Sequence, residues 1–145
     1  MKLKNLEERL DKVCRTVEIG LRDIQELQRI ELDIILKSDL SGFPEAESQF
    51  IKNSPAIYVL AHQTIYINEA TFFQFSTLEH RSIIVHEIGH AYRHLNEIPK
   101  EEMSDMPMLF YHSECVLADL LTCKWGFIEG LISERAKSYG DSYVE

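Results

Sequence analysis

The segment 86–90 contains two histidines four residues apart, His86 and His90, and a glutamate, Glu87, directly after the first. Residues four apart lie on the same face of an α-helix, so both imidazoles can reach one metal ion. Neutral imidazole is a good ligand for Zn²⁺, and two histidines with one carboxylate leave a fourth position for water. The H-E-x-x-H spacing therefore predicts two metal ligands, His86 and His90, and one general base, Glu87.

The sequence around this motif favours the helix that the chemistry needs. Ser76 and Glu79 have the S-x-x-E spacing of a capping box, which opens a helix. Apolar residues then recur at three- and four-residue intervals, at Ile84, Ile88, Ala91 and Leu95. We predict an amphipathic helix of about 18–20 residues that ends before Pro99 and holds both histidines away from its buried stripe.

A third metal ligand has to come from elsewhere in the chain. His94 continues the four-residue series, but eight residues of helix place it about 12 Å along the axis from His86, too far to share an ion. A carboxylate from a second helix is the better source, and Glu114 and Asp119 are the two candidates. They are five residues apart and point about 140° away from each other on a helix, so they have different roles.

At these residues the sequence resembles the gluzincin-type minimal zinc metallopeptidases, including the ImmA/IrrE-like group and similar small zincins of phages and bacteria. The resemblance covers about residues 29–130. It is carried by a strand reading Ile-Tyr-Ile-Asn at 65–68, by the 86–90 motif, and by a later helix with a glutamate ahead of Ala118 and Asp119. It implies an α+β, minimal zincin-like domain with one Zn²⁺ per chain that hydrolyses peptide bonds.

The later helix departs from the family pattern by one residue. In that pattern the metal-binding glutamate lies three residues before the alanine, whereas Glu114 lies four before Ala118 and Cys115 occupies the expected place. One residue turns a helix by about 100°. We expect Glu114 as the third ligand, with Asp119 hydrogen-bonded to a histidine Nδ1. Asp119 as the direct ligand, and a Cys115 thiolate, are the alternatives.

Residues 1–145 are expected to form one domain, with an N-terminal amphipathic helix over 1–28 and a catalytic core over 29–130. The apolar seam of the first helix could also serve a coiled coil, but it spans only about three heptads and Gly20 interrupts it. Packing against its own domain is therefore the preferred reading of this helix.

The remaining pattern predicts a small sheet of about three strands and two further helices. One strand is expected near 30–36, and the β-rich runs 56–60 and 64–68 are expected to form a hairpin. Segment 38–55 reads as a loop with one helical turn near 45–50. Segment 97–108 reads as a loop that is either a substrate-facing lid or an ordinary linker. A metal-ligand helix over 107–125 and a short C-terminal helix over 127–138 complete the fold.

Composition restricts the partners. The net charge is −9, from 15 Lys+Arg against 24 Asp+Glu, which argues against binding to nucleic acid or to an anionic membrane. The three cysteines share no framework spacing, so we expect free thiols in the cytoplasm. The sequence shows neither a signal-peptide pattern nor an apolar run of membrane-spanning length. The expected partner is a protein or peptide substrate.

The sequence thus predicts a zinc metalloendopeptidase in which Glu87 takes a proton from water and later returns it to the leaving amine. Tyr111 and His112 are the candidate oxyanion donors, with Tyr92 and His62 as further choices. One alternative is a zincin-fold protein-binding or regulatory module with little or no peptidase activity. Another is a structural protein whose motif is accidental.

Overall fold

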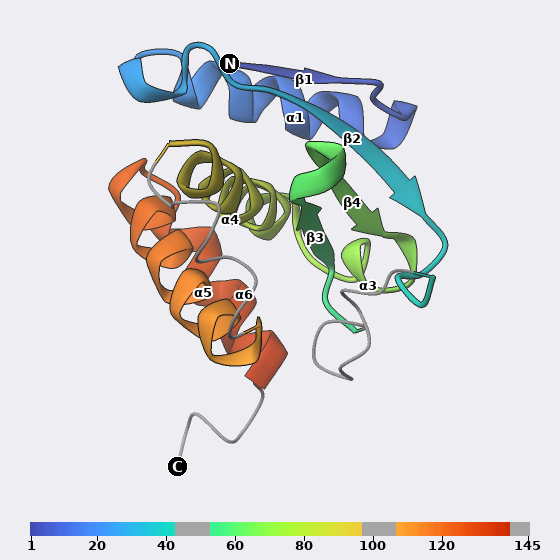
Figure 1. Ribbon diagram of the computed structural model, residues 1–145. Helices are drawn as coiled ribbons and strands as arrows, with labels where there is room; N and C mark the ends of the chain where they lie inside the picture. The colour runs from blue at the N-terminus through green and yellow to red at the C-terminus, as the bar shows by residue number, and fades with distance from the viewer. Residues whose placement is uncertain (43–52, 97–106, 140–145) are drawn as a thin grey trace.

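The computed structural model describes residues 1–42, 53–96 and 107–139. In these residues, five α-helices and a mixed four-stranded sheet form an α+β arrangement (Figure 1). The predicted helical turn at 45–50 lies outside the described residues. So does the predicted loop at 97–108, except for its last two positions, which are helical.

The sheet has the strand order β1-β2-β4-β3 and is formed by β1 (Lys2–Lys4), β2 (Glu31–Lys37), β3 (Ala56–Val59) and β4 (Thr64–Asn68). Strands β1, β2 and β4 are parallel, and β3 pairs antiparallel with β4. All five residues of β4 are buried, because this strand is covered on both faces and has a neighbour on each side. The predicted hairpin of β3 and β4 is confirmed. A 3₁₀ turn (Leu60–His62) connects its two strands.

The N-terminal region differs from the prediction of one helix over 1–28. This region consists of strand β1, helix α1 (Glu8–Leu21) and a 3₁₀ turn, η1 (Gln25–Leu27). Asn5 has a φ of 60°, a left-handed conformation that an α-helix cannot contain, so the helix starts only after it. Leu3 has the helical spacing but is fully buried in a strand beside β2, which adds a fourth strand to the predicted three.

Helix α1 buries its apolar face in its own domain. The residues on this face are Leu10, Val13, Cys14, Val17 and Leu21. They belong to the same core cluster as β2, β4 and the motif helix. Gly20 leaves room for a ring from the C-terminal region, since a Cβ there would lie 2.9 Å from Cζ of Phe127. The glycine that interrupts the heptads therefore serves packing within the chain.

The motif helix is α4 (Thr77–Asn96), which follows the short helix α3 (Glu69–Phe72). Its predicted capping box is confirmed. The Ser76 N–H donates to Glu79 Oε1 at 2.7 Å, and the Glu79 N–H donates to Ser76 Oγ at 3.3 Å. Two orphan donors at the helix start are thereby satisfied. Residues 82–91 are all buried, so the middle of this helix lies inside the protein.

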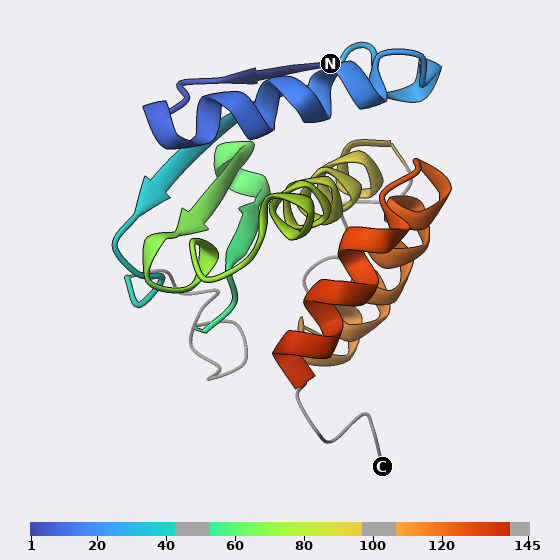
Figure 2. The same cartoon turned by 180° about the vertical axis from the view of Figure 1, so that it is seen from behind.

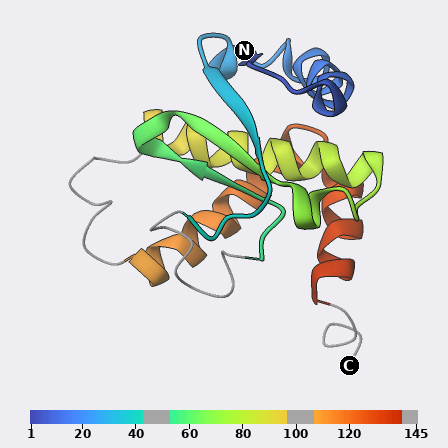
Figure 3. The same ribbon diagram turned by 90° about the vertical axis from the view of Figure 1, so that its right-hand side faces the viewer.

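Helix α4 is the central element of the fold. Figures 1 and 2 show it between the sheet on one side and the pair α5 (Pro107–Lys124) and α6 (Ile128–Tyr139) on the other, and Figure 3 shows it nearly side-on. Gly126, with a φ of 98°, separates α5 from α6, as the sequence predicts. Among the described residues, no helix combines the length and the apolar character that crossing a membrane requires.

Candidate metal centre

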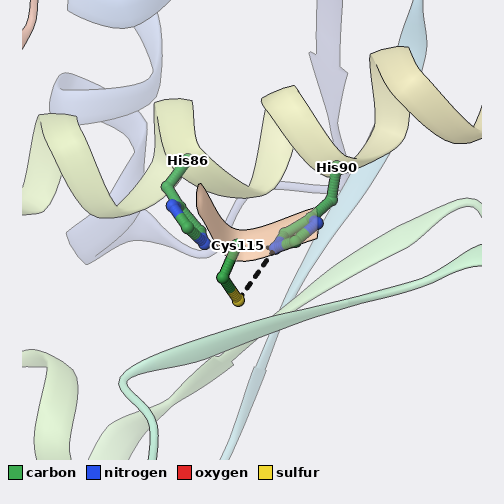
Figure 4. Close-up of side chains that lie close together, drawn as sticks. All are labelled: His86, His90 and Cys115. Atoms are coloured by element: carbon green, nitrogen blue, oxygen red, sulfur yellow. Dashed lines mark hydrogen bonds between the residues drawn. The ribbon is translucent and has the colours of Figure 1, made fainter. Parts of the chain in front are cut away.

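Helix α4 brings the two motif histidines together. Their Nε2 atoms lie 3.1 Å apart, and the two residues are only 8% and 5% exposed. Figure 4 shows both rings, of His86 and His90, on the same side of the helix. Two nitrogen ligands at about 2.05 Å from a tetrahedral zinc ion would be about 3.3 Å apart. The two imidazoles are thus placed so that they could bind one metal ion together.

Helix α5 places the sulfur atom of Cys115 beside the two histidines. The Cys115 Sγ lies 3.7 Å from Nε2 of His90, and the potential ligand atoms of Cys115 and the two histidines all lie within 4.8 Å of one another (Figure 4). With zinc–sulfur bonds of about 2.3 Å, tetrahedral geometry predicts a sulfur–nitrogen separation of about 3.6 Å. His86, His90 and Cys115 therefore form a group that could hold a metal ion.

Glu114, the expected third ligand, pairs with Arg93 and does not join the group of His86 and His90. Its two carboxylate oxygens accept hydrogen bonds from Arg93, at 2.6 Å from Nε and 3.0 Å from Nη2. Among the described residues, no metal-capable group contains both Glu114 and His86. Neighbouring residues of a helix point about 100° apart, so Glu114 is turned toward Arg93 and Cys115 toward the histidines.

A second group of potential ligands shares His90 with the first. Ligand atoms of His90, His94 and Glu114 lie within 4.8 Å of one another. This group is the weaker candidate, because both oxygens of Glu114 are already held by Arg93, whose positive charge would repel a cation. His94 and His86 are not in one group within the described part of the chain, in keeping with the helix rise that separates them.

Asp119 contacts the Nδ1 side of the His86 ring. Its Oδ1 lies 2.6 Å from Nδ1 of His86, the ring nitrogen that faces away from His90. A carboxylate at this position fixes the Nδ1–H tautomer, which leaves the Nε2 lone pair for a metal ion. The hydrogen bond between Asp119 and a histidine Nδ1 that is expected from the sequence is thus present. Arg135 of α6 donates to the same Oδ1 at 2.6 Å.

The two histidines have opposite electrostatic environments. Burial would lower the pKa of His86, but its hydrogen bonds with Asp119 and Cys115 outweigh burial and raise that pKa to about 10. Burial lowers the pKa of His90 well below its ordinary value, and the charge on His86 acts in the same direction. The two Nε2 atoms, 3.1 Å apart, lie within hydrogen-bonding distance of each other at the point where a cation would bind both.

Glu87 faces the sheet. Burial raises the pKa of its carboxyl group to about 7, against the opposing influence of the charge on His86 and of a hydrogen bond from the backbone N–H of Tyr58. Tyr58 belongs to the edge strand β3, so the carboxyl group lies between α4 and the edge of the sheet. A carboxyl group with a pKa near neutrality can both accept and donate a proton at physiological pH.

Of the four candidate oxyanion donors, the structure describes the side chains of His62 and Tyr92. The side chains of Tyr111 and His112 lie outside the described part of the structure, so that prediction stays open. Nδ1 of His62 forms a hydrogen bond with the Tyr66 hydroxyl at 2.7 Å. The Tyr92 ring contacts Trp125 edge-on, with ring centroids 5.8 Å apart.

Sequence reasoning missed two arginines of this region, Arg93 and Arg135. Neither belongs to a motif, and each acquires its role only because its helix packs next to a carboxylate from another helix. Cys115 did leave a signal, since it lies three residues before Ala118 and its thiolate is one of the alternative ligands predicted from the sequence. Comparison of the chain with protein-family models, with curated proteins and with solved structures gave no match.

Proposed function

We propose that this protein is a zinc-dependent metallopeptidase of the minimal zincin type. The observation that carries the proposal is the convergence of His86 Nε2, His90 Nε2 and Cys115 Sγ, with Glu87 buried on the same helix. Nitrogen and sulfur are the donors that zinc prefers, and three protein ligands leave a fourth position for water, as in catalytic zinc sites. The resemblance to the gluzincin group agrees with the two histidines and Glu87, and differs in the third ligand, which is Cys115 in place of a glutamate.

The proposed ligand set is His86, His90 and Cys115, with Asp119 as the hydrogen-bond partner of His86. It replaces the set with Glu114 that the sequence favoured, since Glu114 is engaged by Arg93 through both oxygens. The zinc ion would supply Lewis acidity for polarising water and the peptide carbonyl.

Glu87 carries the proton transfers in this proposal. Its carboxylate accepts a proton from the attacking water and returns it to the leaving amine nitrogen. Burial keeps its pKa near 7, which suits both transfers, and the Tyr58 backbone N–H orients the group. We also propose that the protein lies in the reducing cytoplasm, in keeping with its three cysteines, which form no disulfide.

The first test is the metal content of protein purified without added metal. The native chain should contain one zinc, and His86→Ala and Cys115→Ala should lose it, whereas Glu114→Ala should keep it if it folds. Glu87→Gln should keep zinc and lose peptide hydrolysis. A native chain that binds no zinc even when it is supplied, or a hydrolytically active Glu87→Gln variant, would contradict the proposal.

A second candidate function is a zincin-fold binding module with little or no peptidase activity. The Cys115 thiolate favours it, because a thiolate passes more negative charge to zinc than a carboxylate and weakens the Lewis acid. A zinc-loaded native chain that forms a stable complex with one protein but cleaves no peptide would support the module. Cleavage that depends on Glu87 would support the peptidase.

A further inference from the structure

Helix α6 contributes a side chain to the surroundings of the metal centre. Nη2 of Arg135 donates to Oδ1 of Asp119 at 2.6 Å, and the same oxygen lies 2.6 Å from Nδ1 of His86. Nη2 itself lies 3.4 Å from that nitrogen, a longer contact than either of these hydrogen bonds. We infer that Arg135 is a positioning residue of the metal centre, which acts on the bound ion through Asp119 and His86. The inference rests on the metal site of the proposed function and adds a residue that neither motif nor ligand spacing indicates.

Asp119 needs an anchor of this kind. Its side chain is 30% exposed, so a lone hydrogen bond to His86 would leave the carboxylate partly hydrated and able to rotate away. Arg135 approaches from a different helix, and its bond to Oδ1 holds that oxygen against the imidazole. A guanidinium is suited to this because it remains charged at any physiological pH and presents its donors in a rigid plane.

Arg135 is itself held on its other side. Its Nη1 forms an ion pair with Glu134, which is only 2% exposed, and Glu134 also accepts a hydrogen bond from Ser138 Oγ at 2.8 Å. Charges thus alternate from Glu134 through Arg135 to Asp119, and the row ends at the Nδ1 proton of His86. Each group restricts the next one, so the orientation of the ligand ring depends on α6.

The position of α6 is set independently of this row of charges. Gly130 lies so close to α4 that a Cβ there would be 2.3 Å from the carbonyl oxygen of Leu78. Lys137 forms a second link, donating to the buried Glu79 at 2.6 Å. Arg135 is therefore presented to Asp119 by a helix that backbone packing holds in place. This also provides a control, because Lys137 anchors α6 without touching Asp119.

The test is a comparison of Zn²⁺ affinity, measured by competition with a chromophoric chelator, across Arg135→Gln, Arg135→Lys, Asp119→Asn and the double variant Asp119→Asn with Arg135→Gln. Loss of a group that supports a metal ligand lowers affinity about 10- to 100-fold. Arg135→Gln should show a loss in this range and Arg135→Lys a smaller one. The double variant should bind zinc no more weakly than Asp119→Asn alone, because Arg135 acts through Asp119.

The control is Lys137→Gln, which should lower thermal stability and leave Zn²⁺ affinity within about twofold of native. Three results would overturn the inference: unchanged affinity in Arg135→Gln, a full additive loss in the double variant, or an equal loss in Lys137→Gln. None of these measurements uses hydrolysis. A native chain that binds zinc but cleaves nothing would contradict the peptidase alone, and one that binds no zinc would overturn both.

Discussion

Gly89 of α4 lies directly against Ala118 of α5, so close that a Cβ on Gly89 would be 3.3 Å from both Cα and Cβ of Ala118. The two residues occupy equivalent places in their helices. His86 and His90 stand three before and one after Gly89, and Cys115 and Asp119 stand three before and one after Ala118. This close contact therefore brings both histidines together with the cysteine and the aspartate.

Replacing Gly89 by alanine should separate the helices at this contact. Alanine favours a helix by about 1 kcal/mol over glycine, so the helix itself should persist, but the added methyl group must displace Ala118 by a few tenths of an ångström. Since ligand geometry tolerates little displacement, we expect zinc affinity to fall about 10-fold or more. Chelator competition measures it, with circular dichroism to verify the helix.

The companion variant Gly89→Ala with Ala118→Gly returns part of the space and should recover part of the affinity. Equal zinc affinity in the native chain and in Gly89→Ala would show that this contact does not control the metal site.

Cobalt substitution should identify the third ligand by its spectrum. A Co²⁺ ion bound by a thiolate shows an intense near-ultraviolet charge-transfer band, which nitrogen and oxygen ligands do not produce. We expect the band in the native chain and its loss in Cys115→Ser, with Cys123→Ser as the matched control on the same helix. A native cobalt complex without that band would exclude Cys115 as a ligand.

Glu114→Gln should act on stability and leave metal binding intact. The Arg93 and Glu114 side chains are 18% and 5% exposed, and removing one partner leaves a buried charge without its counter-ion, which costs about 3 kcal/mol. Denaturant unfolding measures the loss, and zinc content should stay at one per chain. Loss of zinc from a variant that is still folded would instead make Glu114 a ligand.

The stability of the protein should fall in acid because of Glu79. Burial tends to raise the pKa of this carboxyl group, but hydrogen bonds from Lys137, Ser133 and Ser76 outweigh burial and lower the pKa to about 2. In the unfolded chain the pKa is about 4.3. The charged form is therefore favoured by folding, and its contribution is complete above about pH 5 and is lost as the pH falls toward 2.

This contribution can be isolated with Glu79→Gln. The variant should be about 2 kcal/mol less stable than native at pH 7, the range for hydrogen bonds to a charged group, and the difference should shrink between pH 5 and 2.5. Thermal unfolding across this range measures it, with Glu129→Gln on the exposed side of α6 as control. A difference that does not depend on pH would contradict the assignment.

The elements that the sequence predicts correctly are those whose cause is local. The motif helix with its capping box, the strand near 30–36, the hairpin and the two C-terminal helices follow from periodicity and from turn and capping residues, which act over a few positions. The spacing of His86 and His90 alone predicts that their rings lie together, because helix geometry relates residues four apart.

Other features arise only where two elements pack against each other in the folded protein. Leu3 fits a helix by spacing, yet the open edge of β2 makes it a strand residue. Glu114 and Cys115 are neighbours in sequence. Only the contact of Gly89 with Ala118 brings the cysteine to the histidines and leaves the glutamate with Arg93. Which of the two residues faces the histidines depends on how the surfaces of α4 and α5 pack together. The sequence pattern of one helix alone cannot predict this packing.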